Sequence, residues 1–401
     1  MLNVKTPAEV KNIIKNHFPV IIGESDLIGV PDSSGRVLCC DIVSEEDIPG
    51  FDRSTVDGYA VKASDTFGCS ESMPVVLDLC GEILMGYQPE TELKPGTCAA
   101  VSTGGALPEN ADAVVMLENT ENYGNNMIGI SKPAAPGNNL IFKGDDVKNG
   151  QTVLSAGTNI TPHDTGILSA LGYVEIEVRR KPKVGIISTG DELVKPSETP
   201  KIGQVRNINS VMLTTVVMKY NALPIDYGII PDDETIINIT LEKVVNECDI
   251  VLISGGSSAG TRDMTARVIE NSGEILLHGI AMKPGKPTVL GKIKNKPIFG
   301  LPGHPVAAYL VTELFVKQAV FQLLGTKPET RTTKAKLTES CSSNHGREEY
   351  IPVKLDDSGN ACPIKGKSGL ITTLTDIDGY IRIPRDCEGI QKGTETDVIY
   401  L

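Results

Sequence analysis

The stretch 184–192, Val-Gly-Ile-Ile-Ser-Thr-Gly-Asp-Glu, joins a short apolar run to a polar turn that ends in two acidic residues. Runs of the same kind follow at 225–230, 250–254 and 297–301, and each has the length and composition of a buried strand. Between the second and third runs, residues 233–248 place their apolar side chains on one face at helical spacing. Because strands alternate with helices, this part of the chain predicts a mostly parallel sheet with helices on both faces.

The sequence on either side of this pattern has a different character. Residues 35–176 carry short β-type runs between glycine and proline turns, and a helix that starts after Thr161 closes them. An amphipathic helix begins near the N-terminus at Thr6-Pro7, and short strands with turns return after residue 327. We therefore predict a multidomain α/β plus β protein. Its parts are an N-terminal region at 1–179 with a β-rich inserted domain at about 48–141, a parallel-sheet α/β domain at 180–326, and a small C-terminal β domain at 327–401.

Composition excludes several classes of protein. The 401 residues carry a formal net charge of -13, which argues against a general nucleic-acid binder. The nine cysteines are odd in number and form no CxxC pair, which favours a reducing cytosol and a cytoplasmic location over a disulfide framework or a zinc site. The N-terminus lacks the apolar core of a signal peptide. The longest apolar stretch, 307–324, contains Glu313 and Lys317, and we expect it to be too short and too polar to span a bilayer.

Acidic residues follow three of the predicted strands. They are Asp191, Glu192, Asp232, Asp233 and Asp263. In open α/β sheets ligands bind beyond the carboxyl ends of the strands, so these carboxylates are candidates to hold a hard cation such as Mg²⁺. Each one taken singly is better explained as a helix cap or a solvated charge, whereas three acidic loops on one edge favour a metal or phosphate role for the set.

Glycine-rich turns at 255–256, 284–285 and 302–303 follow other strands of the same sheet. Their backbone N–H groups could bind an oxyanion, and Lys283 and Lys286 could neutralise its charge. Glycine is also the usual residue wherever the backbone needs a positive φ, so each turn alone is weak evidence. None of them is a Walker A sequence or a GxGxxG fingerprint.

Three polar turns stand out in the β-rich region, at 51–60 (Phe-Asp-Arg-Ser-Thr-Val-Asp-Gly-Tyr-Ala), 102–108 and 143–146. Ordinary turn chemistry explains them as well as a binding role does. The sequence contains no HxxxH pair of the kind found in metalloproteases. It also shows no recognisable set of serine, histidine and acid that would indicate a serine hydrolase. The single HxxE spacing, at 345–348, we interpret as a solvated loop.

Six motifs together resemble one family. Phe51-Asp-Arg-Ser-Thr-Val-Asp-Gly-Tyr-Ala, Ser188-Thr-Gly-Asp-Glu-Leu, Gly228-Ile-Ile-Pro-Asp-Asp, Ser254-Gly-Gly, Met282-Lys-Pro-Gly-Lys-Pro and Gly300-Leu-Pro-Gly-His-Pro stand in the order and spacing of the MoeA and gephyrin E-domain family of molybdopterin molybdenumtransferases. The resemblance covers essentially the whole chain. It implies an α/β domain of the molybdopterin-binding type and the insertion of molybdate into adenylylated molybdopterin in the presence of Mg²⁺, with release of AMP.

The resemblance also implies roles for particular residues. The family's functional polar residues fall on Asp57, Thr103, Asp146, Glu192, Asp232 and Asp263. Of these, Glu192, Asp232 and Asp263 are the expected metal ligands, while Ser254, Gly255, Gly256, Lys283, Lys286 and Gly303 are expected to contact the pterin nucleotide or molybdate. Family members are elongated homodimers in which each cleft combines two subunits, and a molybdopterin adenylyltransferase is a further expected partner.

The chain departs from the family pattern around the expected anion site. Ser257, Ser258, Thr261, Arg262 and Met264 replace the usual residues after Ser254-Gly-Gly, and Gly279, His304 and Ala307 are further differences. Three alternatives therefore stay open: a tungstate-specific paralogue, a molybdopterin-binding carrier without turnover, and an adenylyltransferase.

Overall fold

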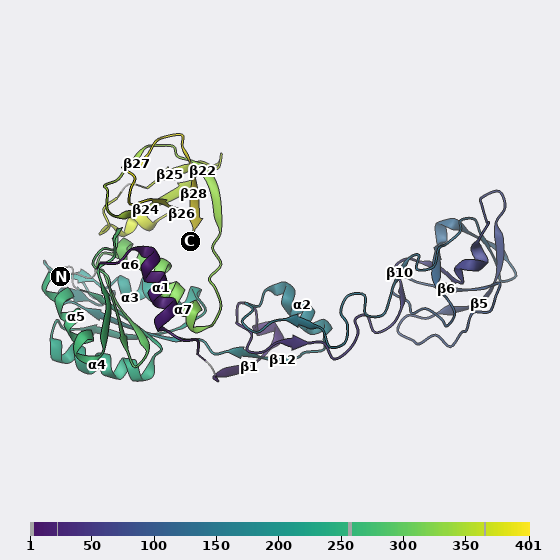
Figure 1. Ribbon diagram of the computed structural model, residues 1–401, viewed down its shortest axis with the longest axis horizontal. Coiled ribbons are helices and arrows are strands. Elements are labelled where there is room, and N and C mark those ends of the chain that lie inside the picture. Colours follow the sequence, from purple (N-terminus) through teal and green to yellow (C-terminus); the bar gives the residue numbers. More distant parts are fainter. Residues whose placement is uncertain (1–3, 22, 256–258, 365) are drawn as a thin grey trace.

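The computed structural model describes residues 4–21, 23–255, 259–364 and 366–401. Figure 1 shows an elongated molecule in which the central α/β part and the C-terminal β part lie at one end. The strands labelled β5, β6 and β10 lie at the other end, and a narrow section with β1, β12 and α2 connects the two. The predicted class, α/β plus β with a β-rich N-terminal region and a small C-terminal β domain, is confirmed.

The central sheet has six strands in the order β16-β13-β17-β21-β20-β18. The first four in that order are parallel and contain the four predicted strands: β16 (Leu223–Ile230), β13 (Lys183–Thr189), β17 (Ile250–Gly255) and β21 (Lys296–Leu301). The sheet is extended by two antiparallel strands, β20 (Val289–Ile293) and β18 (Glu274–His278). Lys294 and Asn295 connect β20 to β21 with positive φ at both positions, the backbone that a tight hairpin needs.

Helices cover both faces of this sheet, as predicted. One face packs against α1 (Pro7–His17), α3 (Asn209–Lys219), α6 (Pro305–Val311), the π-helical segment η4 (Thr312–Val316) and α7 (Lys317–Leu323). The other face packs against α4 (Glu234–Glu247) and α5 (Ala259–Ser272). Helix α4 buries the predicted apolar face, and Asp233 caps its N-terminus by accepting hydrogen bonds from the N–H groups of Thr235 and Ile236.

The continuous helical stretch Pro305–Leu323 corrects one expectation. By length and composition it is long and apolar enough to cross a membrane, with a mean hydropathy of 1.3 over its most apolar 18-residue window, so the expectation of a stretch too short and too polar is wrong. However, 72% of that window is buried inside the protein, against the sheet and α1. This burial accounts for the apolar composition without a bilayer, because the helix belongs to the core.

The N-terminal region contains two separate β structures. Near the α/β part, β1 (Ser25–Gly29) pairs with β12 (Glu175–Arg179), β2 (Ile42–Val43) pairs with β11 (Thr152–Leu154), and α2 (Pro162–Ala170) starts at a capping box on Thr161. At the far end, a six-stranded sheet runs β7-β4-β6-β5-β9-β8. Its strands are Ala113–Met116, Gly58–Val61, Thr97–Val101, Val75–Ile83, Met127–Ile130 and Thr120–Gly124, and β3 (Arg53–Ser54) pairs with β10 (Leu140–Ile141) beside it.

The C-terminal sheet runs β19-β24-β26-β28-β22. Its strands are Met282–Lys283, Glu348–Leu355, Gly379–Ile383, Glu395–Tyr400 and Thr332–Lys336, and β25 (Ala361–Pro363) pairs with β24. Two short strands, β23 (Cys341–Ser342) and β27 (Gly389–Ile390), pair with each other. Strand β19 comes from the lysine-rich turn of the α/β part, so it joins the two parts directly.

Arg180 fixes the connection between the narrow section and the α/β part. Its guanidinium donates from Nη1 and Nη2 to Asp249 at 2.6 and 2.9 Å, and its Nε contacts Glu24. Asp249 also accepts from the Lys183 N–H at 2.7 Å. Burial by itself raises the pKa of Asp249, but the hydrogen bonds from Arg180 and Lys183 outweigh it and hold the pKa below its ordinary value.

Replacing Arg180→Met is expected to lower the free energy of unfolding by about 2 kcal/mol, because it leaves Asp249 half-buried without its cation. The folded pKa of Asp249 is lowered, so the stabilisation is present above the ordinary aspartate pKa and is lost as the pH falls through the folded value. In thermal unfolding measured from pH 7 to pH 3, the difference in unfolding temperature between Arg180→Met and wild type should become smaller as the pH falls. Lys181→Met, at an exposed neighbouring position, is the control, and equal stability of the two variants would contradict this role.

Candidate functional site

Three carboxylates lie in the neighbouring turns that follow two parallel strands, β13 and β16. The last paired residues of these strands are Thr189 and Ile230, so the turns that follow leave the sheet side by side. Asp191 and Glu192 lie in one turn and Asp232 in the other, and the Asp232 N–H donates to Asp191 Oδ1 at 3.2 Å. The Oδ1 atom of Asp232 is buried and has no hydrogen-bond partner among the described residues.

The electrostatics of this carboxylate cluster favour a positive charge. Burial, and then the negative charges of Asp191 and Glu192, raise the pKa of Asp232, and a backbone hydrogen bond with Asp191 offsets only part of the rise. Glycine at 190 makes this arrangement possible. It has φ of 148°, and a Cβ there would lie 2.6 Å from Glu192 Oε2. A bound cation would relieve the repulsion among the three carboxylates.

The structure places the three expected metal ligands unequally. Glu192 and Asp232 lie together, whereas the side chain of Asp263, in α5, falls outside the described part of the chain. Among the described residues no group of three histidine, cysteine, aspartate or glutamate side chains is close enough to hold a metal ion. Mg²⁺ is commonly held by one or two carboxylates together with substrate phosphates and water, so this donor set fits that ion. Asp233 caps α4 instead, which matches the capping interpretation weighed for it.

A buried amide network lies at the end of the next strand, β17. Asn209 Nδ2 donates to Ser254 Oγ at 2.9 Å and to the Gly303 carbonyl at 2.9 Å, so it ties two expected substrate-binding residues together. Its Oδ1 is buried without a partner in the described residues. Gly255 is required here because a Cβ would lie 1.9 Å from Thr189 Oγ1 on the neighbouring strand. Gly256 lies outside the described residues.

Sequence reasoning missed this asparagine pair. Asn207 donates from Nδ2 to Ser188 Oγ at 2.9 Å and, like Asn209, is less than a tenth exposed. Two buried amides at the start of α3, each bonded to the end of a different strand, position the polar turns that surround them. The signal was present in the run Arg206-Asn-Ile-Asn-Ser, a polar cluster directly before an apolar helix.

The two expected lysines line a second part of the site. Lys283 and Lys286 border a pocket of about 850 Å³ between the α/β loops and the C-terminal β part. Lys283 Nζ forms an ion pair with Glu349 Oε1 at 2.8 Å, across the β19–β24 pairing. From the C-terminal part, Arg347, Lys367 and Ser368 also line the pocket. This pocket therefore carries four cationic side chains around one glutamate, an environment suited to an anion.

His304 connects the two walls of this pocket. Its ring Nδ1 lies 3.0 Å from Ser368 Oγ, and the Ser368 carbonyl accepts from the Val306 N–H at 3.2 Å. His304 is one of the positions at which the sequence differs from the family pattern. The structure shows that it contacts the C-terminal β part. Arg347 and Ser368 were not predicted. The interpretation of residues 345–348 as a solvated loop is wrong for part of the segment, because Arg347 lines the pocket and Glu348 begins β24.

The expected site residues of the β-rich region lie elsewhere. Asp57 Oδ1 accepts from the Thr103 N–H at 2.7 Å and from Thr103 Oγ1 at 3.1 Å, so these two predicted residues are in contact. Asp146 is exposed in a separate turn, where its N–H donates to the Ile48 carbonyl at 3.0 Å. Asp57 and Thr103 belong to the sheet at the far end of the molecule in Figure 1, so one chain does not bring them to the carboxylate cluster.

Comparisons with known proteins match nearly the whole chain. Residues 5–172 match the MoeA N-terminal region (domain I and II), 185–322 match a probable molybdopterin binding domain, and 334–401 match the MoeA C-terminal region (domain IV). A molybdopterin molybdenumtransferase of Bacillus subtilis is 32% identical over 100% of this chain and 96% of its own. A putative molybdopterin biosynthesis protein of Methanocaldococcus jannaschii is 35% identical over 93% of this chain and 92% of its own length. The crystal structure of a molybdopterin biosynthesis MoeA protein from Pyrococcus horikoshii OT3 is similar with a TM-score of 0.89 and 38% identity, over 99% of this chain and all of that one.

The carboxylate cluster predicts a gain of stability from Asp232→Asn. A carboxyl whose folded pKa is raised contributes stability below its unfolded pKa and loses it as the pH rises through the folded value, so at pH 7 the ionised Asp232 destabilises the metal-free fold. In a chelator at pH 7, thermal unfolding should occur at a higher temperature in Asp232→Asn than in wild type. The same variant should bind Mg²⁺ about tenfold or more weakly by calorimetry.

Asp233→Asn is the matched control for this experiment, because asparagine caps a helix as well as aspartate does and Asp233 only caps α4. It should leave both the unfolding temperature and the Mg²⁺ affinity near the wild-type values. A metal-free Asp232→Asn protein that unfolds at the same or a lower temperature than wild type would show that the cluster is not strained.

Proposed function

The chain belongs to the MoeA family of molybdenum cofactor biosynthesis enzymes, and from that membership we propose that it inserts molybdate into adenylylated molybdopterin with release of AMP. The observation that carries this proposal is the carboxylate cluster at the β13 and β16 ends, with the unpartnered oxygen of Asp232 at its centre. It lies on the same sheet as the Ser254 and Gly303 turns, where an α/β sheet binds its ligand.

In the proposed reaction, the carboxylate cluster, the asparagine network and the cationic pocket each have a separate role. Glu192 and Asp232, together with Asp263, are the residues to hold Mg²⁺. Bound there, the ion supplies charge neutralisation at the phosphoanhydride that joins AMP to the pterin. The network of Asn207 and Asn209 positions the Ser254 and Gly303 turns against the nucleotide. Lys283, Lys286 and Arg347 hold the molybdate oxyanion in their pocket, where it can meet the dithiolene sulfurs.

A homodimer is part of the proposal, because one chain leaves Asp57 and Thr103 far from the carboxylate cluster. Two elongated chains placed side by side in opposite directions could bring the β-rich tip of each against the α/β part of the other. The exposed apolar residues of α3, among them Val211 at 55% and Met218 at 59%, offer a surface for such a contact. We also place the enzyme in the cytoplasm, receiving its substrate from a molybdopterin adenylyltransferase.

The reaction is tested by incubating the protein with adenylylated molybdopterin, molybdate and Mg²⁺ and measuring AMP. AMP release that depends on the protein is expected, and Glu192→Gln should lower it by about tenfold or more, because a charge beside the anhydride is lost with little change in volume. Repeating the assay with tungstate measures the preference between the two oxyanions. Tight substrate binding with no AMP release would contradict turnover and indicate a carrier.

A mixed dimer tests whether the site is shared between subunits. Asp57→Asn and Glu192→Gln are each expected to be inactive as homodimers, because each lacks one half of both sites. Co-expressed in equal amounts, half of the dimers are heterodimers with one intact site, so about a quarter of the wild-type activity should return. No recovery in a mixture whose heterodimers are verified by mass spectrometry would place both halves of the site in one chain.

A further inference from the structure

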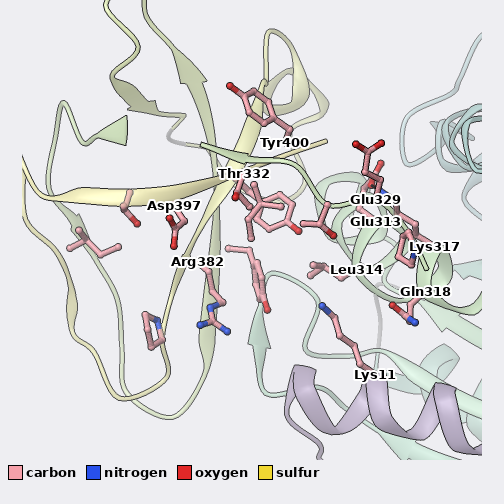
Figure 2. A pocket seen from close by; sticks show the side chains of 18 of the residues that line it. Lys11, Glu313, Leu314, Lys317, Gln318, Glu329, Thr332, Arg382, Asp397 and Tyr400 are labelled. Atoms are coloured by element: carbon pink, nitrogen blue, oxygen red, sulfur yellow. Dashed lines mark ion pairs between the residues drawn. The ribbon is translucent and has the colours of Figure 1, made fainter. Parts of the chain in front are cut away.

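A second pocket, of about 530 Å³, lies between the helices of the α/β part and the C-terminal sheet. Figure 2 shows Lys11 of α1 and Leu314, Lys317 and Gln318 of the helical stretch entering it from one side, and Arg382 of the C-terminal sheet from the other. The π-helical segment Thr312–Val316 forms part of its wall. π-Helical turns are often found at functional sites.

One face of the C-terminal sheet supplies an apolar and aromatic wall. Tyr350 and Tyr380 pack edge to face with ring centroids 5.6 Å apart, and both are nearly buried. Arg382 pairs directly with Tyr350 across β24 and β26, so its side chain emerges on the same face. Leu314, Ile390 and Ile399 add aliphatic side chains to this lining. This wall could cover the body of a small organic molecule.

Most acidic side chains of the pocket already have cations. Glu313, with a side chain only 3% exposed, lies 3.3 Å from Lys219 Nζ and 3.8 Å from Lys317 Nζ. Glu329 pairs with Arg331 at 2.9 Å, and Asp397 with Lys334 at 3.7 Å. Glu395, at the exposed margin, is the remaining acidic group that lines the pocket. Three of the four acidic side chains that line the pocket therefore have cationic partners of their own.

Two cations in the pocket are incompletely neutralised. Lys11 forms no ion pair among the described residues, and Arg382 reaches Glu348 only at 3.7 Å, while the same Glu348 oxygen accepts from the Tyr350 hydroxyl at 2.8 Å. In Figure 2 the side chains of Lys11 and Arg382 come from different elements, and their cationic ends both lie in the lower part of the view. Burial, and then the nearby Arg382 charge, lower the pKa of Lys11, and the negative charge of Glu348 offsets only part of this effect. A further negative charge beside Lys11 would stabilise its cationic form.

This pocket is separate from the one that holds Lys283 and Lys286. The two pockets share one lining residue, Tyr350 of β24, and the rest of their linings differ. Glu348 contacts Arg382 on one side, whereas Glu349 contacts Lys283 on the other. A ligand in the smaller pocket would therefore leave the lysine turn of the proposed active site free.

We propose that the pocket between α1 and the C-terminal sheet binds a small amphipathic organic anion, whose oxyanion head lies between Lys11 and Arg382 and whose apolar body lies against Tyr350, Tyr380 and Leu314. The head is a carboxylate or a phosphate, since both accept hydrogen bonds from an ammonium and a guanidinium. Such a ligand joins α1 to the C-terminal sheet.

The test is ligand-observed NMR on the full-length protein with three probes: benzoate, phenyl phosphate and inorganic phosphate. At least one of the two aromatic probes should bind with a dissociation constant on the order of 1 mM, and inorganic phosphate more weakly. The aromatic probe that binds more tightly identifies the head as carboxylate or phosphate. Lys11→Met and Arg382→Met should each weaken that binding by about tenfold or more.

Two controls keep the test specific. Lys15→Met, on an exposed part of α1 outside the pocket, should bind as wild type. All titrations are made in the Lys283→Gln/Lys286→Gln background, so that the cationic pocket of the proposed active site does not contribute to the signal. Circular dichroism checks that every variant is folded. The proposal is overturned if no aromatic probe binds saturably up to about 20 mM, if inorganic phosphate binds as tightly as the aromatic probes, or if folded Lys11→Met and Arg382→Met proteins keep wild-type affinity.

Discussion

Parallel pairing of β13 with β16 is the constraint on which the rest of the site depends. It forces the turns after Thr189 and Ile230 to leave the sheet together, so Asp191, Glu192 and Asp232 meet although 40 residues separate them along the chain from 192 to 232. Like charges this close oppose folding, and here burial adds to that cost. The helices on both faces and the buried strands that hold the turns in place offset it. A cation relieves it, which is how a strained arrangement becomes a binding site.

The same reasoning explains why the site is divided among several parts of the molecule. The carboxylate cluster and the asparagine network are fixed by the α/β core, whereas the cationic pocket needs the C-terminal part, which supplies Arg347 and Glu349. Asp57 and Thr103 form a third group on a sheet of their own. The proposed substrate, adenylylated molybdopterin, contains a nucleotide, a phosphoanhydride and a dithiolene. A large substrate with such different chemical groups suits a site assembled from separate surfaces.

Much of the fold was predictable because its signals are local. The four parallel strands are nearly continuous apolar runs, and α1, α2 and α4 begin at caps that the sequence displays. The antiparallel strands β20 and β18 were not predicted, and the turn from β20 to β21 uses Lys294 and Asn295 at positive φ instead of a glycine. The expectation that the stretch Pro305–Leu323 is too polar depended on charged residues such as Glu313. The sequence does not show that Glu313 is buried beside Lys219 and Lys317.

The site was predictable only where chemistry follows a strand. Asp232 and Asp233 are adjacent in sequence, yet one faces the cluster and the other caps α4, a difference set by tertiary geometry. Asn209 stands in a polar run before an apolar helix and Arg347 in a polar segment, and neither pattern by itself shows that these residues lie at the site. The remoteness of Asp57 from Glu192 is likewise a property of the whole arrangement.

The most direct measurement of the central claim is a crystal structure of the protein with bound AMP and with Mn²⁺ substituted for Mg²⁺. The anomalous signal of Mn²⁺ locates the metal. The account predicts one strong peak at roughly 2.2 Å from carboxylate oxygens of both Glu192 and Asp232, with Asp263 beside it. A metal bound away from this cluster, or an AMP phosphate on a different edge of the sheet, would contradict the account.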